Sequence, residues 1–395
     1  MSVELKLDFP AIQTRYTEKE IKEIANAIQN AKTLSMGPYL KAFEEQFAAY
    51  LNVRHAIGVI NASSALELAV MLLDIQEGDE VILPAHTFTS TALPFLRRKA
   101  QIVFADIDPD TWVMDVEDAE KKISYKTRVI VPVHLYGLPV QMDELKTLAE
   151  SHGLFIIEDC AQSPGAEFNG KKVGVFGNVG CFSFHGQKNI TTLGEGGMIV
   201  TSSDDFANKI LGLRKIGQRP YKSQTKYWLP AMTNVIEAIP GMVPFNFALG
   251  EIQAYAGSLL LKRLDENNEK RRKIRNQICQ SLTHHPELVF QKIPSNCTSA
   301  YHLLPAYFNG EAFEKTRDDL IELLYTEYGI KSVIQYYPLY RYELFQKHGY
   351  ISAECPRTDH FFDHMVSFPF GSDLTDQEVN YLIDSIDEAI YKLKG

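Results

Sequence analysis

One lysine occupies a position that suits carbonyl chemistry. Lys188 lies between an apolar segment, 180–184, and the glycine-rich stretch 194–197. A lysine amine adds to a carbonyl group where burial or a neighbouring cation keeps it uncharged, because its ordinary pKa of about 10.4 leaves it protonated at neutral pH. A surface lysine beside a tight hairpin connection is the alternative, since glycine tolerates positive φ angles.

An aspartate ends another apolar segment. Asp159 follows the run 154–157, whose continuous apolar residues are typical of a strand covered on both faces. Open α/β sheets bind their ligands at the carboxyl ends of parallel strands, so this position predicts a site residue. An aspartate that only caps the following turn is an equally good interpretation of the position alone.

A third segment could bind a phosphate. Ala62 and Ser63 lie between the predicted strand 56–60 and a helix that runs through Leu73. The start of a helix offers free backbone N–H groups and a positive dipole end to an anion. A plain serine N-cap is the alternative for this segment taken alone.

One cofactor would use all three features together. Pyridoxal phosphate needs hydroxyl and N–H groups for its phosphate, a lysine for an imine with its aldehyde, and a carboxylate for its ring nitrogen. The chain also resembles the DegT-type sugar aminotransferases, which share the fold of aspartate aminotransferase. The matching motifs occur in family order over nearly the whole chain: Gly37-Pro38, Gly78-Asp79-Glu80-Val81, Pro84 with Thr87-Phe88, Glu158-Asp159-Cys160-Ala161-Gln162, Ser183-Phe184-His185 with Lys188, Gly194-Glu195-Gly196-Gly197, Asn246, and Glu251-Ile252-Gln253-Ala254.

The resemblance implies a role for each matching residue. Lys188 would hold the imine and act as general base, and Asp159 would pair with the ring nitrogen. The other implied cofactor contacts are Phe88 stacked on the ring, Gln162 at the ring hydroxyl, Ala62, Ser63 and Ser183 at the phosphate, and Asn246 reaching the phosphate of a neighbouring subunit. His185 and Tyr336 are the candidate substrate contacts.

This chain departs from the family pattern at several of these positions. The family commonly has Gly-Thr at Ala62-Ser63, arginine at the position of Ala248, and histidine at the positions of Gln335 and Tyr340. These changes leave the cofactor expectation in place and affect the contacts expected for the donor and the acceptor.

The elements that would position these residues alternate between strand and helix. The predicted strands are 56–60, 80–83, 101–105, 128–134, 154–157, 180–184 and 198–201. Capping-box patterns that begin at Thr17 and Thr375 predict the first and last helices, and a second helix is expected over 38–51. We therefore predict an α/β fold with a mixed, mostly parallel sheet, which the resemblance identifies as the fold type I of pyridoxal-phosphate-dependent transferases.

The helical pattern from Glu251 changes character near residue 265, where its apolar residues give way to charged ones. A helix of that kind bridges two domains. We predict a large cofactor-binding domain over 1–265 and a smaller α+β domain over 266–395. Within the latter, strands are expected near 299–308 and at 331–336, with a helix that starts at Thr316.

Composition excludes several classes of protein. Forty Lys and Arg residues against fifty Asp and Glu residues give a net charge of -10, which disfavours nucleic acid as a partner. No apolar run is long enough for a membrane span, and the N-terminal residues lack the pattern of a signal peptide. Five cysteines without a CxxC pair argue against a disulfide framework and a zinc site, so we predict a cytoplasmic protein without a metal.

Two other features admit more than one interpretation. The charged run Lys270-Arg271-Arg272-Lys273 is interpreted as a solvated helix face, with binding of a nucleotide diphosphate as the alternative. Tyr221, Tyr227 and Trp228 lie in a long stretch without periodicity, where they could line a substrate opening or hold a loop. His185 is expected to be a hydrogen-bonded residue and not a metal ligand.

The sequence therefore predicts a homodimeric, pyridoxal-phosphate-dependent aminotransferase with a shared active site. By resemblance, its donor is an amino acid, most often glutamate, and its acceptor is a keto sugar carried on a nucleotide, as in amino-sugar and polysaccharide biosynthesis. One alternative is a sugar dehydratase of the same fold, which replaces the lysine by histidine. The other is a non-catalytic regulatory protein, which would need neither Lys188 nor Asp159. A nicotinamide oxidoreductase is disfavoured because no GxGxxG motif opens a strand-to-helix turn.

Overall fold

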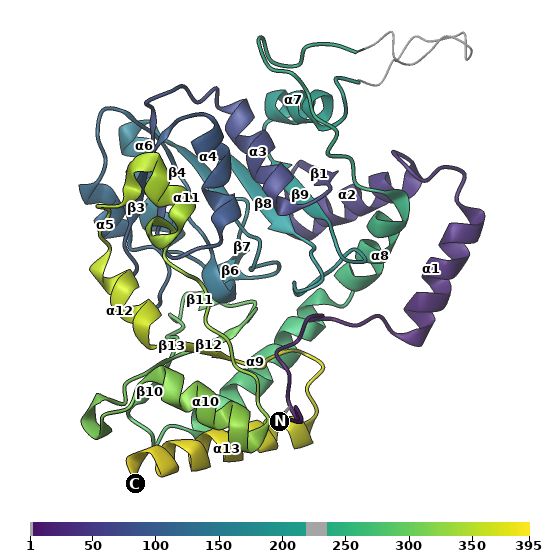
Figure 1. Cartoon of the computed structure of the whole chain (residues 1–395). Coiled ribbons are helices and arrows are strands. Elements are labelled where there is room, and N and C mark those ends of the chain that lie inside the picture. Colours follow the sequence, from purple (N-terminus) through teal and green to yellow (C-terminus); the bar gives the residue numbers. More distant parts are fainter. Residues whose placement is uncertain (1–2, 219–234) are drawn as a thin grey trace.

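The computed structural model describes residues 3–218 and 235–395. Tyr221, Tyr227 and Trp228, predicted to lie at a substrate opening or in a loop, are outside the described residues. Figure 1 shows a sheet wrapped by helices, above a smaller layer that contains the C-terminal helix. Among the described residues, no helix is both long enough and apolar enough to cross a membrane.

A seven-stranded sheet forms the centre of the larger part, in the order β1-β9-β8-β5-β4-β2-β3. Its strands are β1 (His55–Val59), β2 (Glu80–Pro84), β3 (Gln101–Ala105), β4 (Thr127–Ile130), β5 (Phe155–Asp159), β8 (Val179–Ser183) and β9 (Gly197–Thr201). The neighbours from β3 to β8 are parallel, whereas β9 is antiparallel to both β8 and β1. The predicted mixed, mostly parallel sheet is confirmed.

Both faces of this sheet are buried. Side chains alternate along each strand, so that Ile157 packs with one apolar cluster while Ile156 packs with another on the opposite face. The first face is covered by α3 (Ala62–Leu72), α4 (Leu93–Arg97) and α7 (Asp204–Arg214). The opposite face is covered by α2 (Pro38–Leu51), α5 (Val116–Lys121), α6 (Met142–His152) and α8 (Glu251–Leu261). This two-sided burial explains the nearly continuous apolar runs of the strands.

The predicted helix caps are present. Thr17 begins α1 (Glu18–Asn30), Thr316 begins α10 (Arg317–Tyr328), and Thr375 begins α13 (Asp376–Lys394). In each helix the threonine hydroxyl accepts a backbone N–H bond, and an acidic side chain three residues later accepts one in return. These local hydrogen bonds explain why the three starts could be read from the sequence.

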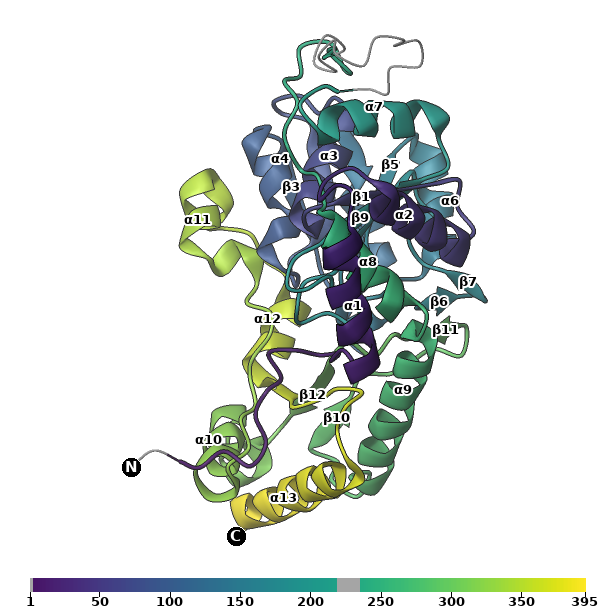
Figure 2. The same cartoon turned by 90° about the vertical axis from the view of Figure 1, so that its right-hand side faces the viewer.

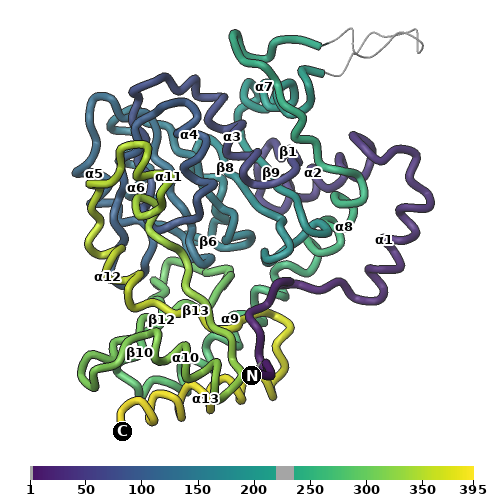
Figure 3. The backbone as a smooth tube through the Cα atoms, in the orientation of Figure 1, coloured from purple at the N-terminus to yellow at the C-terminus, as the bar shows by residue number. Residues whose placement is uncertain are grey.

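A second apolar cluster lies between α13, α10 and a three-stranded antiparallel sheet. The sheet has the order β10-β12-β13, with β10 (Leu288–Phe290), β12 (Leu304–Phe308) and β13 (Met365–Phe368). The long helix α9 (Leu264–Ser281) leads into this part, and the N-terminal segment returns to it through hydrogen bonds from the amides of Lys6 and Leu7 to the carbonyl of Gly329 (Figure 3). The domain boundary near residue 265 stays a prediction.

Three very short strands form a further, small sheet. The strands β6 (Glu167–Phe168), β7 (Lys171–Lys172) and β11 (Cys297–Thr298) form a small antiparallel sheet in the order β11-β6-β7. This sheet lies beside α9 in the view of Figure 2, between the large sheet and the C-terminal layer.

The stretch 339–364 returns to the large sheet from the C-terminal part. It contains α11 (Glu343–Phe345) and α12 (Pro356–His364). Ahead of α11, the amide of Leu339 donates to the carbonyl of Ala85 at 2.9 Å, and the ring of Tyr340 packs against Phe104. Residues of this stretch therefore share the apolar cluster of the large sheet.

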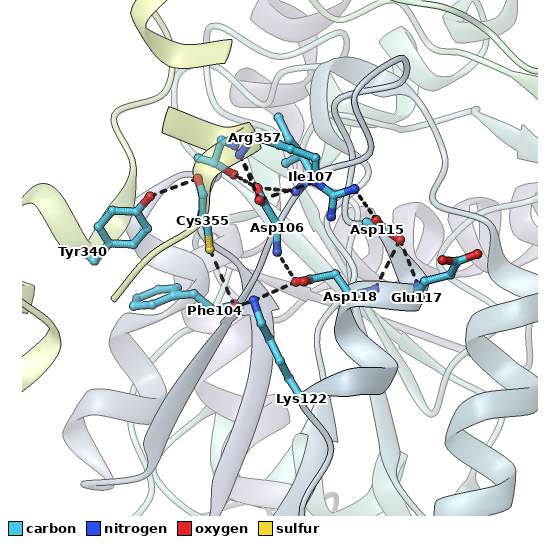
Figure 4. A network of polar contacts seen from close by, with 11 residues as sticks. Phe104, Asp106, Ile107, Asp115, Glu117, Asp118, Lys122, Tyr340, Cys355 and Arg357 are labelled. Carbon is cyan, nitrogen blue, oxygen red and sulfur yellow. Dashed lines mark hydrogen bonds and ion pairs between the residues drawn. The ribbon is translucent and has the colours of Figure 1, made fainter. Parts of the chain in front are cut away.

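A polar network joins α12 to the end of β3 (Figure 4). Asp106 accepts hydrogen bonds from the amides of Arg357 and Thr358, at 3.0 and 2.8 Å, and from the Thr358 hydroxyl at 2.8 Å. Asp106 thus caps the first turn of α12 from a distant segment. The guanidinium of Arg357 also pairs with Asp115, the N-cap of α5, at 2.7 Å, so α12 is joined to the start of α5 as well.

Two predicted strands differ from the structure. Residues 331–336 form no strand; Val333 makes a single antiparallel bridge with Ser367, after which the chain turns toward Tyr136. The strand expected near 299–308 is confined to β12 because the preceding residues bind a loop of the large sheet. There, the amides of Ala300 and His302 donate to the carbonyls of Gly137 and Tyr136, at 2.9 Å each.

Candidate active site

Asp159 is buried at the carboxyl end of β5. Its Oδ2 accepts a 2.8 Å hydrogen bond from the hydroxyl of Thr91, and its Oδ1 accepts one of 3.1 Å from the amide of Ala161. Burial raises the pKa of Asp159, although these hydrogen bonds and the charge of Lys188 oppose the shift. The carboxylate is therefore oriented on two sides and lies within electrostatic reach of the lysine amine.

Lys188 lies in the loop that joins β8 to β9, an antiparallel pair whose register sets Ser183 opposite Gly197. The glycine-rich stretch is thus part of a hairpin connection, as one interpretation of the sequence held, and the lysine is in the same loop. Burial lowers the pKa of Lys188 to about 8, while the charge of Asp159 acts in the opposite direction. At neutral pH an appreciable share of such amines is uncharged, which a nucleophile requires.

The residue after the lysine fixes this loop to other parts of the chain. The side-chain amide of Asn189 donates to Oδ1 of Asn268 in α9 at 2.9 Å and to the backbone carbonyl of Ala300 at 2.7 Å. Its Oδ1 contacts the ring of His302 at 3.0 Å. All of these side chains are buried, so the backbone next to Lys188 has a fixed position.

The N-terminal segment covers the same loop, and a buried arginine holds that segment in turn. The backbone N–H of Gln13 donates to the carbonyl of Gly186, and the Thr14 hydroxyl donates to the carbonyl of Asn189 at 2.9 Å. The guanidinium of Arg271 donates to both the backbone and side-chain oxygens of Gln13, at 3.0 Å each. The prediction that the charged run 270–273 is a solvated face is wrong for Arg271, which is fully buried.

The start of α3 fits a phosphate. Asn61 caps the helix by accepting from the amide of Ser64 at 2.9 Å, so the cap is not the serine that the sequence suggested. Ala62 and Ser63 occupy the first turn, where helix N–H groups lack intrahelical acceptors. Gly197 packs against this turn so closely that a Cβ atom there would lie 2.8 Å from the Ala62 nitrogen. Lack of a side chain at Gly197 therefore allows β9 to approach the turn.

Ser63 and Phe88 are exposed near each other, on α3 and on the turn before α4. The Ser63 hydroxyl donates to that of Ser90 at 2.8 Å, two residues after Phe88. Phe88 has 55 % of its surface exposed, and the ring of Tyr336 approaches it with 6.1 Å between centroids. An exposed aromatic ring at such a position can stack on a planar ligand.

Gln162 connects two tyrosines at the same end of the sheet. Its Oε1 accepts from the amide of Tyr136 at 2.7 Å, and its Nε2 donates to the hydroxyl of Tyr336 at 3.0 Å. The Tyr136 hydroxyl contacts His86 at 2.7 Å. Burial keeps the pKa of Tyr336 above its ordinary value, so its hydroxyl stays protonated. Gln162 and Tyr336, which the sequence listed separately, are thus hydrogen-bonded partners.

The remaining predicted residues differ in burial. Ser183 is buried, and its Oγ accepts from the amide of His185 at 3.4 Å. The ring of His185 accepts from the amide of Gln187 at 3.2 Å, in agreement with its interpretation as a hydrogen-bonded residue. Asn246 is exposed and makes a backbone bridge to Lys215, so its side chain is available to a second molecule.

A buried group of metal-binding residue types lies behind the site, formed by His134, Glu158 and Cys160. The two Glu158 oxygens already accept from three backbone amides at 2.6 to 2.7 Å and lie 3.2 Å from the His134 ring. The other ring nitrogen of His134 accepts from the amide of Val140. Because these hydrogen bonds use the donor atoms that a metal would need, we interpret the group as a structural support of the β5 end.

Known proteins resemble this chain over nearly its full length. A family model described as the DegT/DnrJ/EryC1/StrS aminotransferase family matches residues 15–387. The chain belongs to this family. A GDP-perosamine synthase of Vibrio cholerae is 32 % identical over 377 residues, which cover 95 % of this chain and 98 % of the relative. A UDP-N-acetyl-3-dehydro-alpha-D-glucosamine 3-aminotransferase of Acidithiobacillus ferrooxidans is 33 % identical, over 87 % of this chain and 86 % of the relative.

Solved structures agree with the family assignment. The structure of S. venezuelae DesV in complex with a ketimine intermediate has a TM-score of 0.83 and 30 % identity, and it covers 94 % of both chains. The predictions of a pyridoxal-phosphate-dependent aminotransferase and of its fold are confirmed at the level of the DegT/DnrJ/EryC1/StrS family. The open first turn of α3, the buried Asp159 and the uncharged fraction of Lys188 fit this cofactor.

Several residues of the site were missed by sequence reasoning. Thr91, Tyr136, His302 and Arg271 contact the predicted residues or hold the segments that carry them. They come from four separate segments, and no local pattern marks them as functional. The only signal was positional, since Thr91 lies shortly after the motif that contains Phe88.

Proposed function

We propose that this protein transfers an amino group from an amino acid, most often glutamate, to a keto sugar carried on a nucleotide. The observation that carries the proposal is the meeting of Asp159, Lys188 and the first turn of α3 at the carboxyl edge of one sheet. These groups match the ring nitrogen, aldehyde and phosphate of pyridoxal phosphate. The amino sugar product would serve polysaccharide or related biosynthesis.

Two residues would handle the protons of the reaction. When bound, pyridoxal phosphate supplies an electron-accepting ring to which the reacting amine is joined. Asp159 holds a proton on the ring nitrogen, because a carboxylate beside that atom favours its protonated form. With its uncharged amine, Lys188 would take a proton from the donor carbon and return it to the carbon of the cofactor that carried the aldehyde. Burial of Lys188 favours this role, since it lowers the pKa of the amine to about 8.

Other residues would bind and orient. The N–H groups of Ala62 and Ser63 and the hydroxyl of Ser183 would bind the phosphate, and Phe88 would stack on the ring. Gln162 would reach the ring hydroxyl from its fixed place beside Tyr336. His185 and Tyr336 would contact the substrates, because they are hydrogen-bonded to Ser183 and Gln162, respectively, and remain partly exposed.

The acceptor class is inferred from relatives. One is named for a GDP-linked amino sugar and another for a UDP-linked one, so different members use different nucleotides. A nucleotide-linked keto sugar is their shared acceptor class. We infer a cytoplasmic enzyme because nucleotide sugars are made there and all five cysteines are free thiols, as a reducing compartment favours.

We also infer a homodimer whose active sites are shared. Several large apolar side chains are exposed, among them Phe88 and the pair Val243 and Phe245 just before Asn246, of which Val243 is 81 % exposed. Large exposed apolar groups of this kind mark an interface. Asn246 follows Phe245 on the same exposed segment, and in such a dimer its amide would bind the phosphate in the neighbouring subunit.

A mixing experiment tests the chemistry and the shared site together. Lys188→Ala and Asn246→Ala homodimers should each be inactive or nearly so with labelled glutamate and a panel of keto sugar nucleotides. If Asn246 acts on the neighbouring site, a heterodimer of the two variants has one native site, and an equal mixture recovers about a quarter of wild-type activity. No recovery in verified heterodimers would contradict the shared site.

A second measurement tests the lysine alone. Borohydride should fix the cofactor covalently, and peptide mass spectrometry should find the added mass on Lys188. Lys171, an exposed lysine of β7, is the matched control, and its replacement by alanine should leave the labelling unchanged. Labelling at another lysine would refute the assignment of Lys188 even if the protein proves to be an aminotransferase.

A further inference from the structure

A cluster of two histidines and an aspartate lies in the C-terminal part, far along the chain from the site residues of the large sheet. His284 and His285 follow α9, and Asp387 lies in the second half of α13. Both Nε2 atoms contact the same Asp387 oxygen, Oδ1, at 2.6 and 2.9 Å. The three potential ligand atoms lie within 4.8 Å of one another.

The second nitrogen of His285 has a partner of its own. Its Nδ1 lies 3.1 Å from Oε1 of Glu287, and Lys394 pairs with the same carboxylate at 2.6 Å. The His285 side chain is fully covered, and that of Glu287 is 8 % exposed. Metal-binding histidines commonly donate their other N–H to a carboxylate, which fixes the ring orientation and turns the free nitrogen toward the metal. The group Glu287-His285 has this arrangement.

The loop that carries these residues is held by backbone bonds. The amide of His285 donates to the carbonyl of Leu282 at 3.1 Å, and the amide of Asn309 donates to the carbonyl of Glu287 at 2.8 Å. The cluster is open to solvent at His284 and Asp387, whose side chains are 47 and 32 % exposed, while His285 is covered. An ion could enter from that side, and water could complete its coordination.

We propose that His284, His285 and Asp387 bind a Zn²⁺ ion. Two imidazole nitrogens and one carboxylate oxygen suit zinc, whereas Mg²⁺ and Ca²⁺ prefer oxygen ligands alone. Zinc sites with three protein ligands keep a fourth position for water. The ion would take the place of the protons now shared between the two rings and the carboxylate, and these would leave to solvent.

Binding requires a small expansion of the cluster. Ligand atoms about 2.0 to 2.1 Å from a tetrahedral zinc lie about 3.3 Å apart. The present contacts of 2.6 and 2.9 Å are shorter, so the separations of His284 and His285 from Asp387 must widen by about 0.7 and 0.4 Å, respectively. The side chains of His284 and Asp387 are 47 and 32 % exposed, so both can move, while His285 and its partner Glu287 stay in place.

The ion would tie two segments together. The 284–287 loop follows α9, and Asp387 belongs to the final helix α13, which contacts α9. Tyr391, one turn later in α13, already packs its ring near both histidines. Because bound zinc would link the last helix to this loop, we expect it to stabilise the C-terminal part and to leave the large-sheet site unchanged.

Calorimetry and thermal unfolding of the tag-free holoenzyme test the proposal after treatment with EDTA. Added ZnCl₂ should bind with one equivalent of micromolar affinity, and a 100-fold excess over Kd should raise the unfolding midpoint by about 2 to 5 °C. His284→Ala should remove both effects, and Glu287→Gln should weaken affinity about 10-fold. His152→Ala, which removes an exposed histidine of α6, should change neither.

The variants also define the result that would overturn the proposal. His284 is exposed, so its replacement should leave folding intact, which circular dichroism verifies. If wild type and His284→Ala bind zinc with the same affinity, or if zinc moves neither midpoint, the cluster is only a hydrogen-bonded support of α13. Asp387→Asn, which keeps a hydrogen-bond acceptor but loses the charge, should weaken zinc affinity at least 10-fold if the site is real.

Discussion

Thr91 donates a 2.8 Å hydrogen bond from its hydroxyl to Oδ2 of Asp159, although 68 residues separate the two in the chain. Both side chains are buried. Thr91 also contacts the hydroxyl of Thr87 at 3.1 Å, so a short chain of hydroxyl groups leads to the carboxylate. The hydrogen bond from Thr91 opposes the increase that burial causes in the pKa of Asp159, and it orients the carboxylate.

Replacing Thr91 by valine should therefore weaken the site. A buried hydrogen bond to a charged group contributes about 1.5 to 3 kcal/mol, so we expect a comparable loss in unfolding free energy or in cofactor affinity. The pKa of Asp159 should rise, and turnover should fall about 10-fold or more. Thr91→Ser keeps the hydroxyl and should remain close to wild type. Equal losses in both variants would show that packing, not the hydrogen bond, matters at this position.

The pH dependence of cofactor attachment should report on Lys188. The amine adds to the aldehyde only when uncharged, so attachment to the apoenzyme should accelerate as pH rises and level off above about 8. Stopped-flow absorbance measures this rate. Asp159→Asn removes a charge that raises the pKa of Lys188, so its midpoint should move to lower pH. A midpoint near pH 10 in the rate profile of the wild type would contradict the inference that burial lowers the pKa of Lys188.

Arg271 should be far more sensitive to replacement than its neighbour Arg272. Arg271→Met leaves two oxygens of Gln13 without their donor, and we expect a loss of about 3 kcal/mol in denaturant unfolding. Hydrogen exchange at the amide of Gln13, which bonds to the Lys188 loop, should accelerate. Arg272 is half-exposed and, within residues 3–218 and 235–395, its ion pair is with Glu269, so Arg272→Met should change stability by about 0.5 kcal/mol or less.

Acid should expose the role of Asp106 in the network of Figure 4. Burial acts to raise its pKa, but hydrogen bonds from Arg357, Ile107 and Thr358 outweigh this and hold the pKa below its ordinary value. The folded-state pKa is therefore below the unfolded one. The resulting stabilisation is present above about pH 4 and is lost as pH falls through the folded-state value.

Asp106→Ala tests this dependence. We expect a loss of about 1 to 3 kcal/mol at pH 7, measured by urea unfolding, because two amides of the first turn of α12 lose their acceptor. The difference between wild type and variant should shrink toward pH 3. A difference that stays constant with pH would mean that the charge of Asp106 contributes nothing.

The strands of the large sheet and the helices around it could be predicted because patterns within each segment determine them. Runs such as the one before Asp159 are continuous enough to identify buried parallel strands, and capping boxes such as that of Thr17 fix helix starts with two hydrogen bonds. The segment 331–336 was predicted wrongly because its apolar pattern fits a strand, whereas only Val333 has a ladder partner. Strand formation there depends on a neighbour that the sequence does not identify.

The site could be predicted in part for a similar reason. Asp159 and Lys188 lie in motifs, but Arg271 appears in a run of four cations whose other members are exposed. Helical periodicity predicts that one of these four residues faces the interior. That a buried arginine is tolerated at position 271 is explained only by Gln13, which accepts its hydrogen bonds from a distant part of the chain. Thr91 and His302 are brought to the site by long-range contacts, which no spacing in the sequence encodes.

The return of residues 339–350 to the rim of the large sheet has a consequence for synthesis on the ribosome. Tyr350 accepts a hydrogen bond from the amide of Ile102, on the edge strand β3, and its ring packs on Phe104. Until those late residues emerge, a nascent chain carries β3 with an uncovered edge, which is open to pairing with other chains. Chaperone capture of incomplete chains should therefore depend on whether Tyr350 has emerged from the ribosome.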